Sequence, residues 1–325
     1  VSVEQGLMNA NKNLKINYAR GANVTDDPVL IQRLNAHGGN LDIDPRDAQA
    51  MIDEAVKVAQ VSDVIVAVVG ESQGMTGEAA SRADISLPGN QLDLLKALKE
   101  TGKPLVIILM NGRPMTLPWE AENADAILVT WFSGTEAGNA IADILLGNHN
   151  PSGKLTATFP YHVGQVPIYY NAKNTGRPYN NQVLDKYKSR YMDVPNEPLF
   201  PFGFGLSYTT FSYGDVKLDK KEISSGGQIK VACRVSNTGS MAGEEVVQLY
   251  VQDVVGSVTR PVKELKGFQK IMLQPGESRD VTFTLTEKDL SFYRLDMTYG
   301  TEPGQYNVFV GGNSRDVKKG EFLLK

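Results

Sequence analysis

Apolar residues in the first half of the chain gather in uninterrupted runs instead of alternating with polar residues. The runs are Val64–Val69, Leu105–Met110 and Ile127–Trp131. A strand gives such a run when both faces of its sheet are covered. Segments with apolar residues at helical spacing lie between and around the runs, at 48–59, 90–100 and 135–147. This order predicts an α/β sandwich over residues 1–160, with a mostly parallel sheet and helices on both faces.

Capping residues indicate where these helices begin and end. Asp44 is expected to cap the helix at 48–59, and glycines at 102 and 147 are expected to end the next two helices in the left-handed conformation. At the N-terminus the pattern predicts a further helix, followed by a strand at Leu14–Tyr18.

After residue 211 apolar residues occupy every second position. The residues that share one face of a predicted strand are Ile229, Val231, Cys233 and Val235, then Val247, Leu249 and Val251, then Val281, Phe283 and Leu285, and finally Tyr306, Val308 and Val310. Clusters of Ser, Gly, Asn and Pro separate these strands as turns. About seven short strands at this spacing predict a β-sandwich of the immunoglobulin or fibronectin type III kind over residues 212–325. Cys233 is expected to be a small core residue.

Residues 161–211 join the two halves and are too aromatic for a flexible linker. We expect an ordered strap. Its tyrosines pack on the domains or line a sugar site, and they are Tyr161, Tyr169, Tyr170, Tyr179, Tyr187 and Tyr191.

Composition excludes several classes of protein. The chain has 325 residues, 41% hydrophobic and 22% charged, which suits two folded domains. Its net charge of −4 and the lack of a long basic run argue against nucleic-acid binding. No apolar run is long enough to cross a membrane. One cysteine and three scattered histidines favour neither a disulfide nor a metal site, and no cofactor is expected.

Candidate chemistry lies where the predicted strands end, because open parallel sheets bind ligands beyond the carboxyl ends of their strands. The first run is followed by Gly70–Pro88, a long segment rich in Gly, Ser and Ala, and loops of this length are usually functional. Asn111 and Arg113 follow the second run, and Trp131 ends the third.

Two kinds of hydrolase compete for this loop. Gly70–Gly74 matches G-x-S-x-G, which would make Ser72 a nucleophile, and His37-Gly38-Gly39 resembles an oxyanion-hole motif. A nucleophile elbow leads straight into a helix, however, and here more loop follows. Glu71 and Glu78 could instead supply carboxyl groups of the kind that glycosidases use, although a glutamate on a polar loop is more often only solvated. The glycine spacing does not fit a dinucleotide-binding fingerprint.

At this loop the chain resembles glycoside hydrolase family 3, and most of all its bacterial periplasmic β-glucosidase group. The segments that carry the resemblance are Val68–Arg82 with Leu87-Pro88, Met110–Pro114, Gly134–Asp143, Asn150–Leu155, Asn174–Tyr179, Pro201–Thr209 and Arg260–Phe268. The resemblance implies an α/β sandwich domain followed by a fibronectin type III-like domain. It also implies a missing N-terminal (β/α)8 barrel that holds an aspartate nucleophile. The chain is then the C-terminal portion of a longer enzyme, in which the sheet domain begins after its usual first strand.

The family's acid/base glutamate falls on Glu78 when it is counted back from Arg82 and the Leu-Pro pair. This chain has Ala79-Ala80-Ser81 where many members have other residues, so Glu71 stays as an alternative. Arg82, Asn111, Arg113 and Trp131 are candidate sugar-binding residues. Of these, Arg82 is expected to anchor the loop by ion pairing rather than to touch sugar. Asn111 and Arg113 could equally brace the loop, and Trp131 could equally be a core residue.

The resemblance implies a retaining exo-β-glucosidase that acts on a β-glucoside or oligosaccharide, in the periplasm or outside the cell. Without the barrel, the chain alone is expected to be inactive. The alternatives are a stand-alone carbohydrate-binding or scaffold module, and the serine hydrolase that would use Ser72.

Overall fold

The computed structural model describes residues 1–36, 41–178 and 186–325. The chain divides into two compact units, which are described separately. The first comprises residues 1–148 and 159–166, and the second comprises residues 149–158 and 167–325. His37-Gly38-Gly39 and Tyr179 lie outside the described residues.

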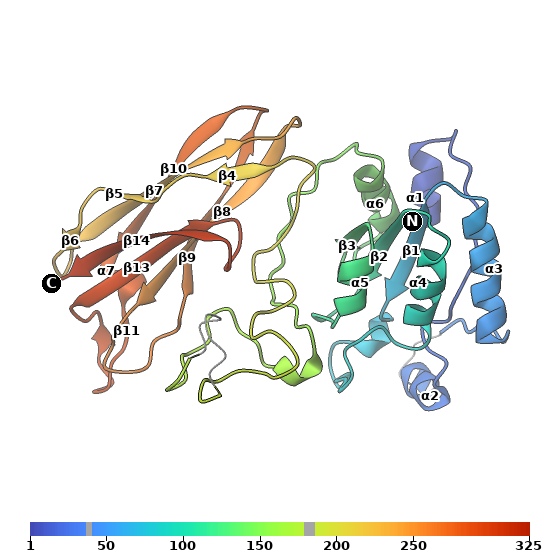
Figure 1. The fold of residues 1–325 in the computed structure, drawn as a ribbon, viewed down its shortest axis with the longest axis horizontal. Coiled ribbons are helices and arrows are strands. Elements are labelled where there is room, and N and C mark those ends of the chain that lie inside the picture. The colour runs from blue at the N-terminus through green and yellow to red at the C-terminus, as the bar shows by residue number, and fades with distance from the viewer. Residues whose placement is uncertain (37–40, 179–185) are drawn as a thin grey trace. The chain divides into compact units, whose positions relative to one another are not determined.

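The first unit is built on a parallel sheet of order β1-β2-β3, as expected (Figure 1). The strands are β1 (Ile65–Gly70), β2 (Leu105–Met110) and β3 (Ala126–Val129). The helices are α1 (Val3–Ala10), α2 (Pro28–Ala36), α3 (Ala48–Gln60), α4 (Gln91–Lys99), α5 (Pro118–Asn123) and α6 (Ala137–Leu145). Helices lie on both sides of the sheet, with α1 packed on α6 and α3 on α4. The central strand β2 is almost wholly buried, which explains its unbroken run of apolar residues.

Two local predictions in this unit are wrong. Asp47, not Asp44, caps α3, since its carboxylate accepts hydrogen bonds from the N–H groups of residues 49 and 50. Asp44 instead pairs with Arg46 at 2.7 Å. Leu14–Tyr18, which the structure describes in full, forms no strand. Its apolar residues are spaced as in a strand, but no neighbouring strand pairs with its backbone.

The second unit is a β-sandwich. Its strands are β4 (Phe211–Tyr213), β5 (Lys217–Leu218), β6 (Glu222–Ile223), β7 (Gln228–Asn237), β8 (Gly243–Asp253), β9 (Glu264–Leu273), β10 (Ser278–Thr286), β11 (Phe292–Tyr293), β12 (Tyr299–Gly300), β13 (Gly304–Gly311) and β14 (Val317–Leu324), and α7 (Glu287–Leu290) follows β10. One sheet has the order β10-β7-β4 and the other the order β6-β14-β13-β8-β9. Almost all of the pairing is antiparallel, in line with the predicted fibronectin type III-like topology.

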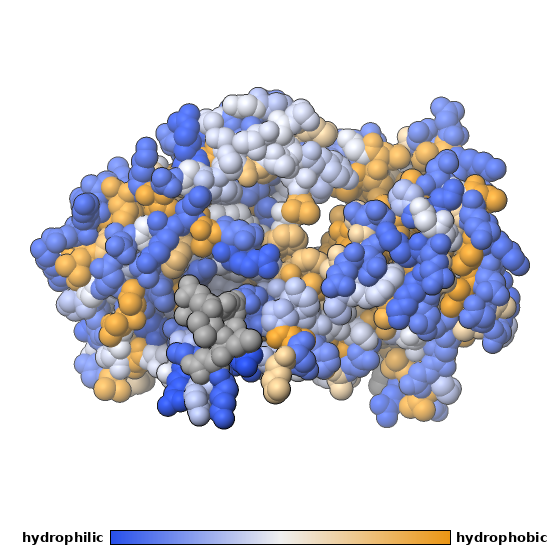
Figure 2. Space-filling model, viewed as in Figure 1, coloured by the Kyte–Doolittle hydropathy of each residue, from blue (hydrophilic) through white to orange (hydrophobic). Residues whose placement is uncertain are grey.

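The alternation seen in the sequence places apolar residues between these sheets. Each of the four predicted strand faces is buried in one hydrophobic cluster, and Cys233 is a free, buried thiol within it. Burial raises the pKa of the Cys233 thiol, which agrees with a core role. Figure 2 shows blue and orange residues interspersed on the outside of the sandwich, because the positions between the core residues face water.

The segments before β4 pack on this sandwich through polar and aromatic contacts. Tyr170 stacks on Phe202 with 4.3 Å between ring centroids, and lies edge-on to Tyr250. Lys154 pairs with the buried Glu245 at 3.0 Å. These contacts explain why residues 149–158 and 167–210 belong to the second unit.

Candidate active site

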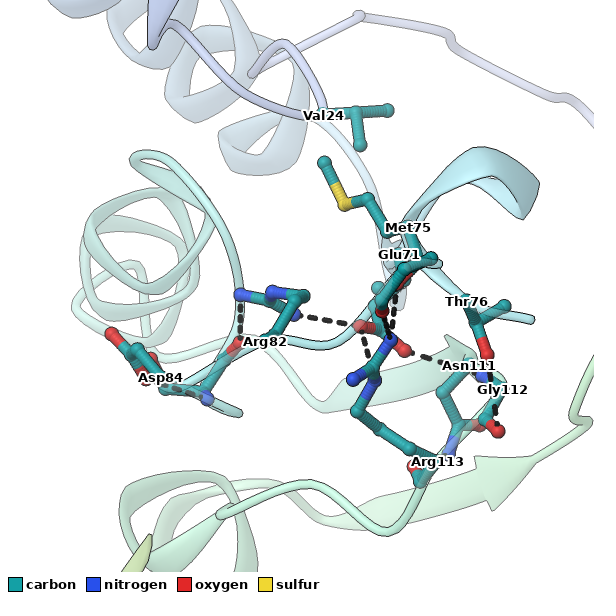
Figure 3. A network of polar contacts seen from close by, with 12 residues as sticks. Val24, Glu71, Met75, Thr76, Arg82, Asp84, Asn111, Gly112 and Arg113 are labelled. Atoms are coloured by element: carbon teal, nitrogen blue, oxygen red, sulfur yellow. Dashed lines mark hydrogen bonds and ion pairs between the residues drawn. The ribbon is translucent and has the colours of Figure 1, made fainter. Parts of the chain in front are cut away.

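The candidate site lies at the carboxyl end of the parallel sheet, where β1 and β2 stop (Figure 3). Gly70 ends β1 at φ +134°, and a Cβ atom there would lie 1.9 Å from the carbonyl oxygen of Met110. Only glycine fits this close approach. The side chain of Gln91, at the start of α4, holds both the N–H and the carbonyl of Gly70, at 2.7 and 2.9 Å. The strand end from which the loop departs is therefore fixed on two sides.

Glu71, the first residue after β1, is buried in a double ion pair. Its carboxylate has no exposed surface and lies 2.7 Å from Nη1 of Arg82 and 2.9 Å from Nε of Arg113. The N–H of Gly112 donates a longer bond to the same carboxylate, at 3.3 Å. Two guanidinium groups contact the carboxylate, and none of its surface is left open to a substrate.

The two arginines also hold the backbone of the loop. Arg113 donates from Nη2 to the carbonyl oxygens of Met75 and Ala80, the second at 2.9 Å. Arg82 donates to the carbonyl of Ser86 at 3.1 Å. The guanidinium groups of both predicted sugar-binding arginines are thus engaged with Glu71 and with main-chain carbonyls.

Glu78 lies in a different environment on the same loop. Glu78 is exposed, and so are the neighbouring residues Gly77 and Ala79. Both neighbours have left-handed backbones, with φ +101° at Gly77 and φ +56° at Ala79. A left-handed alanine costs about 1 kcal/mol, and such strain is common at functional sites. The structure therefore separates the two candidate glutamates, since one is buried and paired and the other faces solvent.

The remaining loop residues are anchored locally. The side chain of Met75 is buried in the turn of 3-10 helix at Gln73–Met75. Asp84 accepts hydrogen bonds from the N–H and the hydroxyl of Ser86, and these bonds lower the pKa of its carboxyl group. Between β1 and α4 the described chain contains no other helix or strand, as the sequence predicted.

The two other candidate residues lie at the ends of β2 and β3. Asn111 is fully buried and donates to the carbonyl of Arg113 at 2.8 Å. Trp131 is half-buried and left-handed at φ +54°, and its ring meets that of Phe159 edge-on at 5.9 Å. Trp131 and Ala79 thus place non-glycine left-handed residues on two loops at the same end of the sheet.

Ser72 lacks the geometry of a hydrolase nucleophile. Its backbone is ordinary extended chain at φ −76° and ψ 157°, and a single 3-10 turn follows it in place of an α-helix. Its Oγ is buried, and among the described residues no group hydrogen-bonds to it. A nucleophile elbow needs a strained turn and an exposed hydroxyl with a neighbouring base.

Other chemistry finds little support in the described ranges. Within residues 1–36, 41–178 and 186–325, no group of three or more His, Cys, Asp or Glu side chains is placed to hold a metal ion. In those same ranges, no helix combines the length and apolar character needed to cross a bilayer.

Sequence reasoning missed three groups that shape the site. They are the side chain of Gln91 and the carbonyls of Met75 and Ala80. No local pattern marks them, because a buried glutamine at a helix start and two loop carbonyls resemble many others. Only the fold shows that one guanidinium reaches both carbonyls.

These features define a class of protein. It has an α/β unit that carries a loop with carboxylates at the carboxyl end of its sheet, followed in the chain by a fibronectin-like sandwich. Residues 1–208 match the family described as the glycosyl hydrolase family 3 C-terminal domain, and residues 245–314 match the fibronectin type III-like domain. The chain belongs to glycoside hydrolase family 3.

Individual relatives agree with this assignment. The chain is 54% identical to a periplasmic beta-glucosidase of Salmonella typhimurium and 42% identical to a beta-xylosidase of Formosa agariphila. In each case all of this chain and 42% of the relative are covered. The crystal structure of the β-glucosidase from Listeria innocua in complex with isofagomine is 39% identical with a TM-score of 0.88, over 100% of this chain and 42% of that one. The chain therefore spans less than half the length of these relatives.

Proposed function

We propose that this chain is the C-terminal part of a retaining exo-β-glucosidase and that it carries the acid/base residue on its Gly70–Pro88 loop. The nucleophile belongs to a barrel domain outside this sequence. The observation that carries the proposal is the contrast between Glu78, exposed at the tip of a strained loop, and Glu71, enclosed by two arginines.

Glu78 is the proposed acid/base residue. In a retaining mechanism one carboxylate attacks the anomeric carbon while a second, protonated carboxyl group donates its proton to the leaving oxygen. The same group, now ionised, removes a proton from the water that releases the sugar. This role needs a carboxyl group that substrate and water can reach, and the exposed Glu78 meets that requirement.

Glu71 is the poorer candidate for this role. Its carboxylate is shared by Arg82 and Arg113 and has no exposed surface. An acid/base residue must be reached by the leaving oxygen and by water, and the two guanidinium groups leave no room for either at this buried carboxylate. We infer that Glu71, together with Arg82, Asn111 and Arg113, braces the loop.

The proposed substrate is a β-glucoside or an oligosaccharide with a terminal β-glucosyl residue. Both similar structures and similar sequences are named β-glucosidases, while one relative is named a β-xylosidase. The two sugars differ only in the hydroxymethyl group at C5. By similarity to the Salmonella protein, the proposed location is the periplasm.

Replacing Glu78 by glutamine in the complete enzyme tests the proposal. Glu78→Gln should lower kcat/KM for cellobiose and alkyl glucosides by about 10²- to 10⁴-fold, since general acid catalysis is worth that much. Glucosides with activated leaving groups need no proton, so the first step should survive for them. Azide, which needs no general base, should restore their turnover and give the β-glucosyl azide.

The matched control is Glu122→Gln, which changes an exposed glutamate on α5 of the same unit. It should leave both classes of substrate unchanged. Normal turnover of cellobiose by Glu78→Gln would refute the assignment, and the same test on Glu71→Gln would then identify the acid.

A further inference from the structure

Arg113 is the residue that connects the buried carboxylate to the tip of the loop. Its Nε lies 2.9 Å from Oε1 of Glu71, and its Nη2 donates to the carbonyls of Met75 and Ala80. The four residues between those carbonyls include Glu78. One rigid guanidinium therefore holds both ends of the short segment that carries the proposed acid.

The other hydrogen bonds of the segment are long, and one of them runs from the hydroxyl of Thr76 to the carbonyl of Gly112 at 3.4 Å. The N–H of Ala80 makes only a long 3.4 Å bond to the carbonyl of Gly77, and the N–H of Thr76 makes another of 3.4 Å to Gln73. The tip residues are exposed and two of them are left-handed. Without an outside contact, a loop of this kind would sample many backbone conformations at little cost.

Burial makes the anchor firm. The Glu71 carboxylate has no exposed surface, and the side chain of Arg113 is 19% exposed. Glu71 directly follows β1, and its N–H donates a hydrogen bond to the carbonyl of Met110 at 2.8 Å. The sheet therefore fixes its position. Figure 3 shows the guanidinium of Arg113 between this carboxylate and the loop. The sheet therefore fixes the position of Glu71, Glu71 fixes that of Arg113, and Arg113 in turn restrains the backbone of the loop tip.

Arginine is required at this position because of its shape. A guanidinium presents several N–H donors in a fixed plane, so it can meet a carboxylate with one edge and two carbonyls with another. A lysine would keep the charge beside Glu71. Its single ammonium cannot hold the carboxylate and both loop carbonyls from the same positions.

We propose that Arg113 is a positioning residue for the acid/base loop, which acts by setting where the carboxyl group of Glu78 lies. This inference rests on the proposed function of Glu78. In the first step a misplaced proton donor slows only the departure of leaving groups that need a proton, and displacement of about 1 Å can cost 10²-fold in rate. The loss should therefore grow with the pKa of the leaving group, and kcat should fall more than KM rises.

The test compares Arg113→Lys with Arg46→Lys. Arg46 also pairs with two carboxylates of the first unit, Asp44 and Glu54, but it is exposed and neither partner belongs to the loop. In the complete enzyme, Arg113→Lys should lower kcat/KM for alkyl glucosides about 10- to 100-fold and change kcat/KM for activated aryl glucosides little, because kcat/KM reports the first step and activated leaving groups need no proton. Arg46→Lys should leave both unchanged. Hydrogen exchange on this 325-residue chain should show faster exchange over residues 75–82 for Arg113→Lys alone.

Each outcome decides the inference. Unchanged exchange over 75–82 would overturn it, because Arg113 would not hold the loop. Arg113→Lys could show faster exchange while its rates depend on the leaving group as in the wild type. If Glu78→Gln makes that dependence steeper, this result would overturn the positioning role of Arg113 and leave the proposed function of Glu78 standing. If Glu78→Gln itself has no effect, the proposed function fails and the inference falls with it.

A second variant applies if Arg113→Lys does not fold. Ala79→Gly removes the strain at φ +56° and loosens the loop, but it leaves all contacts of Glu71 in place. The inference expects the same two changes, faster exchange over residues 75–82 and a steeper dependence on the leaving group. A looser loop with unchanged kinetics would overturn it.

Discussion

Single carboxylates in the first unit show how strongly the local environment decides what a residue can do. Glu71 and Glu120 are both buried, at 5% and 3% exposure. Glu71 is compensated by two arginines. For Glu120 burial is the largest influence and raises the pKa of its carboxyl group, and the attraction of Lys96 offsets this only in part. Glu71 is thus buried against two cationic partners, whereas the burial of Glu120 disfavours the charged form of its carboxyl group.

Glu120→Gln should stabilise the first unit at neutral pH. The pKa of Glu120 is higher in the folded chain than its ordinary value of 4.5. The folded state therefore binds the proton more tightly, and stability falls as the pH rises from 4.5 through the folded pKa. Glutamine is neutral throughout and avoids this loss. The difference in melting temperature should be positive at pH 7 and vanish near pH 3, where both states of the wild type are protonated.

Glu122→Gln, on the exposed side of the same helix α5, should show no such pH-dependent gain. A wild-type chain whose stability rises between pH 5 and 7 relative to Glu120→Gln would contradict the burial argument.

Residue-level prediction failed where two neighbours compete for one role. Asp44 and Asp47 both precede α3, and either could cap it. Asp44 is engaged by Arg46, whose hydrogen bonds lower the pKa of Asp44 to about 2. Asp47 is left to bind the first free N–H groups of the helix. Sequence spacing alone could not show that Arg46 bends back towards Asp44.

Secondary-structure elements followed the sequence where hydrophobic periodicity was long. The three apolar runs and the four alternating faces became strands and core, because no other arrangement buries those side chains. The short pattern at Leu14–Tyr18 failed, because a strand also needs a partner for its backbone groups. Hydrophobic periodicity, whether long or short, does not predict how closely two helices approach each other.

The contact between α1 and α6 depends on two glycines. A Cβ atom on Gly6 would lie 2.0 Å from the carbonyl oxygen of Gly138, so the helix backbones touch. Gly6→Ala would improve helix propensity by up to about 1 kcal/mol, but the clash forces the helices apart and costs about 1–3 kcal/mol. We expect a net loss of stability, measured as a lower urea midpoint of the first unit.

Gly134→Ala is the matched control, because no atom lies within 4 Å of the Cβ position there. Its midpoint should stay close to that of the wild type. A stabilised Gly6→Ala variant would mean that α1 can shift away from α6 without loss of packing.

At the scale of the whole molecule, the proposed function divides the active site between this chain and a part of the enzyme outside its sequence. It covers 42% of the periplasmic β-glucosidase that it matches over all of its own length. The proposed acid is present, but a retaining mechanism also needs a nucleophile about 5–5.5 Å from it. The two units described here can therefore be folded and well packed without being able to turn over a substrate.

The isolated chain is expected to show no hydrolysis of aryl β-glucosides, while the complete enzyme hydrolyses them with retention of configuration. The rate of release of the aryl alcohol measures hydrolysis, and NMR of the first-formed sugar anomer shows whether configuration is retained. The isolated chain that carries Glu78→Gln is the control for contaminating glucosidase activity.

Retaining turnover by the purified chain above that control would contradict the proposed division of the site. Heat of binding on titration of the chain with cellobiose, together with an inactive complete protein, would favour the alternative of a carbohydrate-binding module.

The sequence by itself determined the two architectures, the long loop and the candidate residues on it. Burial patterns and motif spacing are local properties that any chain must satisfy in order to fold, so they can be recognised without coordinates. Only the tertiary structure separated Glu71 from Glu78 and showed that Arg82 and Arg113 face inward. Ion pairs and hydrogen bonds between loops depend on distances that the fold sets, and residues 71 and 113 become neighbours only because β1 and β2 are paired in parallel.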